Sequence, residues 1–301
     1  MKARSPMRVL GFGDNIVDRF LDRAIDYPGG NAVNVAVYTR RLGAHAEYLG
    51  VFGDDELGRF VRASIEDAGV PTPRSVVRAG ESGVTCLRVI DGDRVFLGWN
   101  GGGVTVQQPI DLSDDRAAYV SAFDLVHSSV YSRTEEELPK LRSRDVLVTF
   151  DLSSEPEFRE PSYLDRVAPY ADLVLLSCSG MAEAESFAIL EDAVARGAGI
   201  ALGTRGTDGA VAVDGVARIT VPAEPVDDRE IIDTMGCGDA FVAGFIVDLY
   251  GSGWRRGTQA TASDLHSALR AGAIAARDQC FIEGAFGHGR PIDEDTPVSM
   301  L

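Results

Sequence analysis

Apolar residues recur along this chain in two alternating patterns. Short apolar runs, of the length expected for buried strands, occupy residues 8–13, 47–52, 124–127, 146–151 and 172–177. Stretches with helical spacing lie between such runs; residues 56–67 carry apolar side chains every three or four positions before a stop at Gly69. Alternation of this kind is typical of a parallel, doubly wound sheet with helices on both faces. We therefore predict an α/β fold, a three-layer α/β/α sandwich around a mostly parallel sheet.

One segment alternates at the period of a strand instead. Apolar and polar side chains alternate along residues 84–90, as in a strand. Residues 91–93 have the composition of a tight turn, and residues 94–97 read as the second strand. This pattern predicts a β-hairpin, and the glycines at 101–103 suit a flexible exit from it. We expect the tail, residues 287–301, to be mobile.

The composition is that of a soluble globular protein, with 301 residues of which 45% are hydrophobic and 25% charged. No apolar run approaches the roughly 20 residues needed to cross a bilayer. Residues 1–6 lack the apolar stretch of a secretory signal. A cytoplasmic location is therefore the default expectation.

The net charge of the chain and its few lysines exclude several kinds of partner and site. A formal net charge of −17 argues against nucleic acid and anionic membranes, since both attract basic surfaces. Lysine occurs only at Lys2 and Lys140, and no Gly-x-x-x-x-Gly-Lys-Ser/Thr motif is present, which excludes a P-loop. Any bound phosphates must then be held by backbone amides, arginine and metal.

The strongest candidate for chemistry is the stretch 233–245. Gly236 and Gly238 flank Cys237, Asp239 follows at once, and an apolar run at helical spacing then begins. The backbone N–H groups of such a turn can hold an oxygen that gains negative charge, and Asp239 can take a proton from a neighbouring hydroxyl. This pairing suits phosphoryl transfer to an alcohol. The alternative is a glycine-rich loop with Asp239 as an ordinary helix cap.

Further polar residues lie where predicted strands end. Asp14 follows the first strand, Asp18 is close behind it, and Asp151 ends a later strand. Ligands of open parallel sheets bind at the carboxyl ends of strands, so Asp14 and Asp18 can accept hydrogen bonds from the hydroxyls of a ligand. Solvated loop carboxylates are the alternative. Asp151 lies on the same edge, which is weaker evidence by itself.

A second glycine-rich turn precedes a helix near the N-terminus. Gly29 and Gly30 let the backbone approach a ligand closely, Asn31 opens the helix, and Gly43 is a natural stop. Asn31 is equally compatible with a plain helix cap.

Together these motifs resemble the PfkB, or ribokinase-like, family of sugar and nucleoside kinases. Residues 233–239 are similar to its D-T-x-G-A-G-D signature, with Cys237 in the place where alanine is usual. Residues 13–18 followed by 29–36 are similar to its other signature, and residues 49–55 to a strand-to-loop element. The resemblance covers nearly the whole chain and is greatest to the subfamily that phosphorylates fructoselysine.

The resemblance implies a single ribokinase-like kinase domain over residues 1–301 with a small β lid over the sugar. Residues 16–28 and 84–103 would form that lid. Arg94 or Trp99 would meet the distal part of the substrate, although exposed hairpin residues are the more common explanation for both. The family lids sometimes pair, so a homodimer is compatible with the sequence.

The resemblance also implies roles for individual residues. Asp239 would act as the base, and the amides of Gly236, Cys237 and Gly238 would hold the transferring phosphoryl group. The sugar would be bound by Asp14, Asp18, Gly29, Gly30, Asn31 and Asn34. The nucleotide would be bound by Thr204, Gly206 and Gly209, with Arg205 as a candidate phosphate ligand. Mg²⁺ would arrive with ATP, and Asp233 matches a residue near the monovalent-cation site, K⁺, of some relatives.

The implied reaction is ATP-dependent phosphorylation of a primary hydroxyl, the 6-hydroxyl of fructoselysine or a related fructosamine. Another sugar or a nucleoside, such as a hexose, ribose or adenosine, is the alternative substrate. A non-catalytic sugar- or nucleotide-binding protein is the alternative from another class. Residues 177–180 depart from the family, whose Asn-x-x-Glu arranges magnesium, and Glu183 or Glu185 are candidates to substitute.

The four cysteines show no metal-binding or C-x-x-C spacing. Buried thiols are therefore expected at Cys86, Cys178, Cys237 and Cys280. Cys237 is the exception to watch, because a helix N-terminus lowers the pKa of a thiol and makes it reactive.

Overall fold

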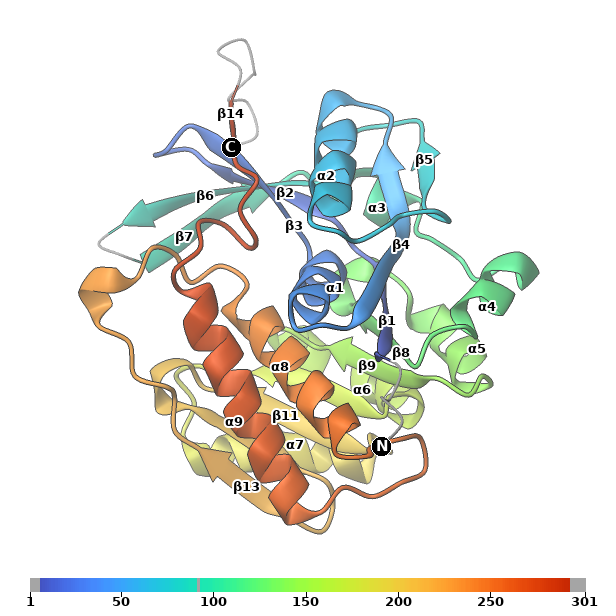
Figure 1. Ribbon diagram of the computed structural model, residues 1–301, viewed down its shortest axis with the longest axis vertical. Coiled ribbons are helices and arrows are strands. Elements are labelled where there is room, and N and C mark those ends of the chain that lie inside the picture. The colour runs from blue at the N-terminus through green and yellow to red at the C-terminus, as the bar shows by residue number, and fades with distance from the viewer. Residues whose placement is uncertain (1–5, 91–92, 293–301) are drawn as a thin grey trace.

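A nine-stranded sheet runs through the centre of the computed structural model, which describes residues 6–90 and 93–292 (Figure 1). The parallel strands, in spatial order, are β5 (Val76–Arg78), β4 (His45–Gly53), β1 (Arg8–Gly13), β8 (Leu125–Ser129), β9 (Leu147–Asp151), β10 (Leu173–Ser177) and β11 (Ile200–Thr204). Two antiparallel strands, β12 (Ala210–Val213) and β13 (Arg218–Val221), complete one edge. The chain leaves β1 toward β4 and β5 and later returns to its other side with β8, so the order reverses at β1.

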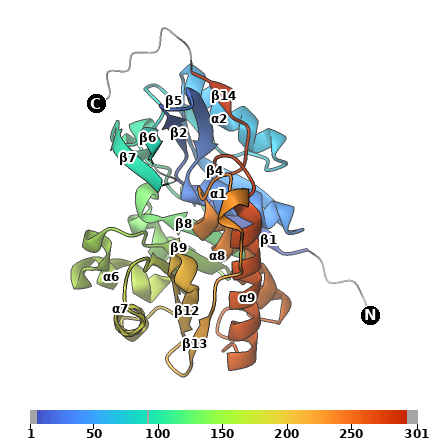
Figure 2. The same cartoon turned by 90° about the vertical axis from the view of Figure 1, so that its left-hand side faces the viewer.

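Helices cover both faces of this sheet, as predicted (Figure 2). One face carries α1 (Asn31–Arg41), α2 (Glu56–Asp67), α8 (Cys237–Gly251) and α9 (Ala262–Gln279). The other carries α3 (Gly103–Gln107), α4 (Asp114–Val120), α5 (Leu138–Arg142), α6 (Pro161–Val167) and α7 (Glu183–Ala195).

The alternation of side chains along each strand accounts for the two cores. Leu125 and Leu147 pack with the residues of α8 and α9, whereas Val126 and Val148 pack with those of α4 to α7. Neighbouring residues of a strand point to opposite faces, so strands buried on both sides read as continuous apolar runs. The α/β/α sandwich expected from the pattern is confirmed.

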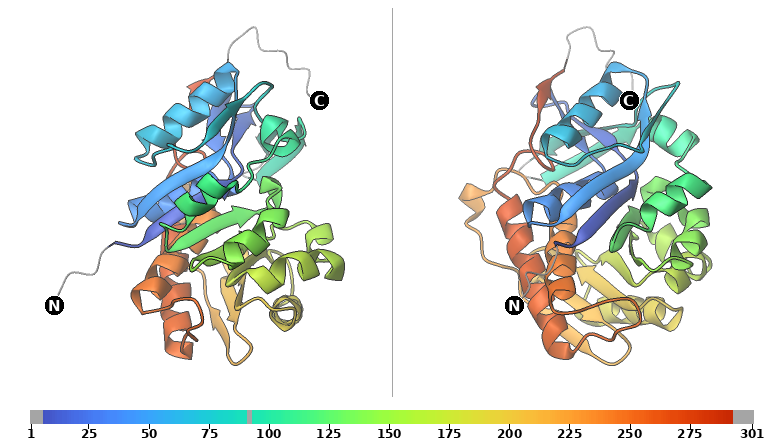
Figure 3. Two further views of the ribbon diagram at one scale, coloured as in Figure 1. Left: turned by 90° about the vertical axis from the view of Figure 1, so that its right-hand side faces the viewer. Right: turned by 45° about the vertical axis from the view of Figure 1, so that its right-hand side comes forward.

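A second sheet lies at one end of the large sheet (Figure 3). Its order is β14 (Arg290–Pro291), β3 (Ile25–Gly29), β2 (Ile16–Phe20), β6 (Val84–Ile90) and β7 (Asp93–Trp99). Because β2 begins directly after β1, this sheet lies at the carboxyl end of β1. Residues 91 and 92 of the expected turn, and the side chain of Arg94, lie outside the described part.

The tail departs in part from its expectation. Residues 287–292 lie beyond α9, which ends at Gln279, and within them β14 pairs with β3, with Arg290 opposite Asp26. The expectation of mobility is wrong for these residues, because pairing with the exposed edge of β3 satisfies their backbone groups. Residues 293–301 lie outside the described part.

Local signals set the ends of the helices that were predicted. Helix α2 has the expected bounds, and the Asp55 side chain caps it by accepting from the Gly58 amide at 2.7 Å. Helices α3, α4 and α6 have no counterpart among the predicted elements; each is short and weakly patterned. Within residues 6–90 and 93–292, no helix has the length and apolarity needed to span a membrane.

Candidate active site

The aspartate of the glycine-rich signature is buried. Asp239 lies in the first turn of α8 and is only 8% exposed. Its Oδ2 accepts a hydrogen bond at 2.8 Å from the Asn34 side-chain amide of α1. The other side-chain atom of that amide, Asn34 Oδ1, is buried and has no partner in the structure, so it is free to accept a hydrogen bond from a ligand hydroxyl.

The surroundings make Asp239 a stronger base than an exposed aspartate. Burial raises its pKa well above the ordinary value, and the nearby carboxylates of Asp151, Asp14 and Asp18 raise it further. The hydrogen bond from Asn34 acts in the opposite direction. A base with a higher pKa takes a proton from an alcohol more readily.

The turn before Asp239 requires glycine at one position and offers space at another. Gly236 is left-handed at φ 76°, and a Cβ there would come within 2.2 Å of the Tyr38 hydroxyl. At Gly238, in contrast, a Cβ would meet no atom within 4 Å. The first turn of α8 therefore faces open space, where a phosphoryl group can approach its amides.

Helix α1 also holds a second buried carboxylate. Asn31 lies three residues before Asn34, on the same face of the helix, and donates to Asp151 Oδ2 at 2.5 Å. The Ser153 amide donates to the other oxygen at 2.6 Å. Burial raises the pKa of Asp151 to about 6 despite these donors. The sequence placed Asp151 on the functional edge but gave no signal that Asn31 binds it.

Asp14 is fixed by residues at and just after the end of β8 and by the start of α1. Its Oδ1 accepts from the hydroxyls of Ser132 at 2.6 Å and Ser129 at 2.9 Å, and from the Ala32 amide at 3.3 Å. Gly30, at φ 112°, lies so close that a Cβ would come within 3.0 Å of Asp14 Oδ2. Sequence reasoning missed both serines, because their pairing with Asp14 spans more than a hundred residues.

These groups line a cavity of about 820 Å³ between the second sheet and the carboxyl ends of β1, β8 and β9. The residues predicted to bind the sugar that line it are Asp14, Asp18, Gly30, Asn31 and Asn34. Gly29 ends the adjacent strand β3 and is not part of the lining. Asp239 lies in the wall of the same cavity, so the residue predicted to act as base and those predicted to bind the sugar meet in one place.

The outer wall of the cavity contains Trp99, which the resemblance suggested for the distal part of the substrate, together with residues that sequence reasoning missed. Phe96 and Trp99 of β7 lie on one side, 62% and 50% exposed. On the other side the Tyr131 hydroxyl donates to Glu155 at 2.5 Å. Burial by itself would raise the pKa of Glu155, but this hydrogen bond and those from Ser153 and nearby backbone amides together lower it. Arg133, held at φ 55°, is the one cationic side chain among the described lining residues.

The three residues predicted to hold the nucleotide lie outside this cavity, around the β11–β12 turn. Thr204 ends β11, and Gly206 and Gly209 have φ values of 59° and 90°. A Cβ at Gly209 would come within 2.1 Å of the Val221 carbonyl oxygen, so the turn requires glycine there. This turn lies at the carboxyl end of the sheet, at the same edge as Asp14.

The segment that replaces the family's Asn-x-x-Glu packs on this turn. The Cys178 amide donates to the Thr204 carbonyl at 2.7 Å, and Ser179 lies beside Gly206. Arg205 forms an ion pair with Glu183 at 3.2 Å, while its buried Nε has no partner in the structure. Glu183 is therefore in contact with the β11–β12 turn through Arg205.

Asp233, the candidate for a monovalent cation, is a buried anchor of the signature loop. It accepts from the amides of Met235 at 3.0 Å and Gly284 at 3.2 Å, and pairs with Arg23 at 3.3 Å. Across the described chain, no group of three or more His, Cys, Asp or Glu side chains is placed to hold a metal ion.

The cysteines meet their expectation only in part. Cys86 and Cys178 are buried, but Cys237 and Cys280 are half-buried, with their sulfur atoms 3.6 Å apart. A hydrogen bond from Cys237 lowers the pKa of the Cys280 thiol to about 7. Nothing in the sequence indicated this pair, because the two cysteines are 43 residues apart and come together only where α8 packs against α9.

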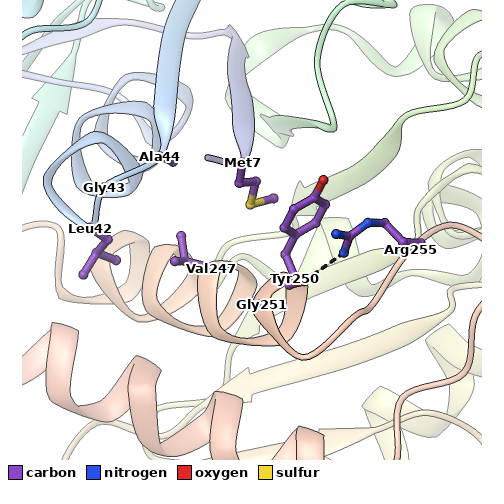
Figure 4. A pocket seen from close by; sticks show the side chains of 8 residues that line it. All are labelled: Met7, Leu42, Gly43, Ala44, Val247, Tyr250, Gly251 and Arg255. Carbon is purple, nitrogen blue, oxygen red and sulfur yellow. Dashed lines mark hydrogen bonds between the residues drawn. The ribbon is translucent and has the colours of Figure 1, made fainter. Parts of the chain in front are cut away.

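Another hollow, of about 360 Å³, lies at the opposite, amino-terminal end of β1 (Figure 4). Met7, Leu42 and Val247 line it with apolar atoms, and Arg255 stacks on the Tyr250 ring and donates to the Tyr250 carbonyl at 2.8 Å. It lacks carboxylates and lies away from the ligand-binding edge of the sheet. We therefore place the active site at the larger cavity.

Comparison with known proteins agrees with this geometry. The profile described as pfkB family carbohydrate kinase matches residues 23–278. The chain is 35% identical over 286 residues to fructosamine kinase FrlD of Bacillus subtilis, covering 95% of each chain. It is 32% identical over 246 residues to fructoselysine 6-kinase of Escherichia coli, covering 81% of this chain and 88% of the relative.

Solved structures of low sequence identity share the fold. A fructokinase from Xylella fastidiosa with bound ATP has a TM-score of 0.75 and 21% identity, covering 93% of this chain and 95% of that one. A ribokinase from Giardia lamblia has a TM-score of 0.76 and 17% identity, covering 93% and 94%.

A buried aspartate at a helix N-terminus, under a small β-sheet at the ligand edge of a doubly wound sheet, defines a sugar kinase. The chain belongs to the pfkB family of carbohydrate kinases. It is an ATP-dependent phosphotransferase that acts on a sugar.

Replacing Asp239 with Asn should reduce turnover by about 1,000-fold, since a positioned general base contributes on that scale. Nucleotide binding should change little, because the amide keeps the size of the side chain. The unfolding midpoint should not fall, because the variant removes a buried carboxylate whose pKa is raised by burial. ADP release and ATP binding by calorimetry measure both effects. Asp248→Asn, farther along α8, is the matched control; a turnover of Asp239→Asn close to that of this control would contradict the assignment.

Replacing Asp151 with Asn should stabilise the ligand-free protein at neutral pH. The folded-state pKa of Asp151, about 6, lies above its ordinary 3.8, so this group destabilises the fold increasingly as pH rises through that window. The free energy of unfolding should rise by about 3 kcal/mol at neutral pH, and this increase should shrink as pH falls toward about 5. Urea unfolding at several pH values, with exposed Asp22→Asn as control, measures it; a pH-independent gain would contradict the cause.

Proposed function

We propose that this kinase phosphorylates the 6-hydroxyl of a fructosamine, with fructoselysine as the reference substrate. The observation that carries the proposal is the charge of the cavity. Its described lining residues include the acids Asp14, Asp18, Glu155, Glu157 and Asp239, with Arg133 as the one cation among them. A plain sugar is neutral and leaves these carboxylates uncompensated. A fructosamine brings a protonated amine, which an acidic cavity attracts. The two relatives named for fructosamine and fructoselysine kinases support the same substrate class.

The size of the cavity supports a substrate longer than a monosaccharide. About 820 Å³ is within the range of sites that enclose a drug-sized ligand. In a fructosamine the amine is on carbon 1, at the far end from the 6-hydroxyl. With that hydroxyl at Asp239, the amine and the attached amino acid extend toward the outer wall, where Glu155 and Arg133 can pair with an ammonium and a carboxylate.

In this mechanism Asp239 accepts the proton of the 6-hydroxyl. Asn34 keeps the Asp239 carboxylate in place through the 2.8 Å hydrogen bond and offers its unpaired Oδ1 to a sugar hydroxyl. Asp14, clamped by Ser129 and Ser132, accepts from other hydroxyls. The amides of Gly236, Cys237 and Gly238 stabilise negative charge on the transferring phosphoryl group.

The cofactor assignments are part of the same proposal. ATP supplies the phosphoryl group, and Thr204, Gly206 and Gly209 would hold it, with the unpaired Nε of Arg205 as a phosphate donor. Mg²⁺ would enter with ATP, and Glu183, in contact with Arg205, is the acid available to orient it. A K⁺ requirement through Asp233, a cytoplasmic location and a homodimer formed through the second sheet also remain proposals.

We expect Mg-ATP turnover on fructoselysine to exceed turnover on fructose, ribose and adenosine by at least about tenfold in kcat/KM, the effect of one compensated charge. ADP release measures each rate, with and without K⁺, and Asp239→Asn provides the blank. Preference for a free sugar or nucleoside would overturn the fructosamine proposal. ATP binding without turnover of any tested substrate would favour the non-catalytic alternative.

Replacing Glu155 with Gln should raise the KM for fructoselysine about tenfold while leaving fructose turnover unchanged, because only the amine loses its partner. The glutamine keeps an acceptor for Tyr131. Exposed Glu160→Gln is the matched control. An equal loss on both substrates would show that Glu155 holds the cavity wall rather than the amine.

A further inference from the structure

Two thiols meet at the base of the phosphoryl-binding turn. Cys237 is the first residue of α8, Cys280 caps the end of α9, and their sulfur atoms are 3.6 Å apart. Helices α8 and α9 lie side by side (Figure 1), so the start of one meets the end of the other. Both residues are half-buried, which leaves the pair open to small reagents.

We propose that Cys237 and Cys280 form a reversible disulfide that inactivates the kinase. A disulfide needs a sulfur–sulfur distance of about 2 Å, so the two atoms must approach by about 1.5 Å, within the reach of small side-chain rotations. A disulfide in a reducing compartment is typically transient and redox-sensing, which is the role inferred for this pair.

The reactivities of the four cysteines favour this pair. The hydrogen bond from Cys237 lowers the pKa of Cys280 to about 7, so a large fraction of Cys280 is thiolate at neutral pH. Burial instead raises the pKa values of the Cys86 and Cys178 thiols. An oxidant therefore reacts first at Cys280, with Cys237 beside it to resolve the product.

The oxidant is a low-molecular-weight disulfide, such as oxidised glutathione. The Cys280 thiolate attacks one sulfur of that disulfide, forms a mixed disulfide and releases one thiolate. Cys237 loses its proton, its thiolate attacks the Cys280 sulfur, and the second thiolate leaves. The protein loses two protons and two electrons, and the oxidant becomes two thiols. Excess dithiol reverses both steps.

The bond would act directly on the catalytic turn. The Cys237 amide lies between those of Gly236 and Gly238, two residues before Asp239. The Cys280 carbonyl already accepts from the amides of Ile232 at 2.8 Å and Asp233 at 3.2 Å, so α9 holds the preceding loop in place. Pulling Cys237 toward this fixed point turns its amide away from the phosphoryl position.

The test treats the full-length protein with oxidised glutathione and then with dithiothreitol. We expect a peptide that links Cys237 to Cys280, and a fall in turnover of about 100-fold, the effect of losing one oxyanion donor, that dithiothreitol reverses. Cys280→Ser, which retains a donor for the Ala276 carbonyl, should keep its turnover under oxidant. Cys86→Ala, with the pair intact, should remain sensitive.

Two results would overturn the proposal. One is the absence of a Cys237–Cys280 link by peptide mapping, which needs no substrate and is therefore independent of the proposed sugar. The other is inactivation of Cys280→Ser to the same extent as the natural sequence. Cys280→Ala gives a second variant in which the same insensitivity is expected.

Discussion

Two amide side chains on one face of α1 hold the two buried carboxylates of this active site. Asn34 donates to Asp239 and Asn31 to Asp151. A neutral amide satisfies part of a buried carboxylate without the strong lowering of pKa that arginine or lysine would cause. The site therefore keeps both acids desolvated and close enough to repel one another, and Asp239 retains the base strength that proton transfer from an alcohol needs.

The position of these groups follows from the topology. Strand order reverses at β1, and Asp14 follows β1 directly, at the crevice where open α/β sheets bind ligands. The helix dipole of α8 points its positive end into the same region. The second sheet covers the cavity that Asp14 and Asp239 line, and the Thr204–Gly209 turn lies outside that cavity.

Local pattern predicted much of this arrangement and not the rest, for physical reasons. Helix α2 and the strand ends at Asp14 and Asp151 carry periodic or punctuating signals, so the sequence located them closely. The glycine-rich turn before Asp239 was identified as a candidate because a glycine–acid motif is compact. The partners of the acids were not, because Ser132 contacts Asp14, and Cys280 contacts Cys237, across long stretches of chain. The outer wall at Glu155 belongs to irregular segments that have no period to detect.

The two walls of the cavity differ in how much of the fold they support. Asp14 and Asp239 are each tied to other elements, whereas Phe96 and Trp99 are largely exposed. Substitutions in the exposed wall disturb little of the core, so they carry a small stability cost. Mutations at Phe96 and Trp99 can therefore change which substrate binds without disturbing Asp14 and Asp239. On such a scaffold, substrate specificity can evolve while the chemistry of phosphorylation is retained.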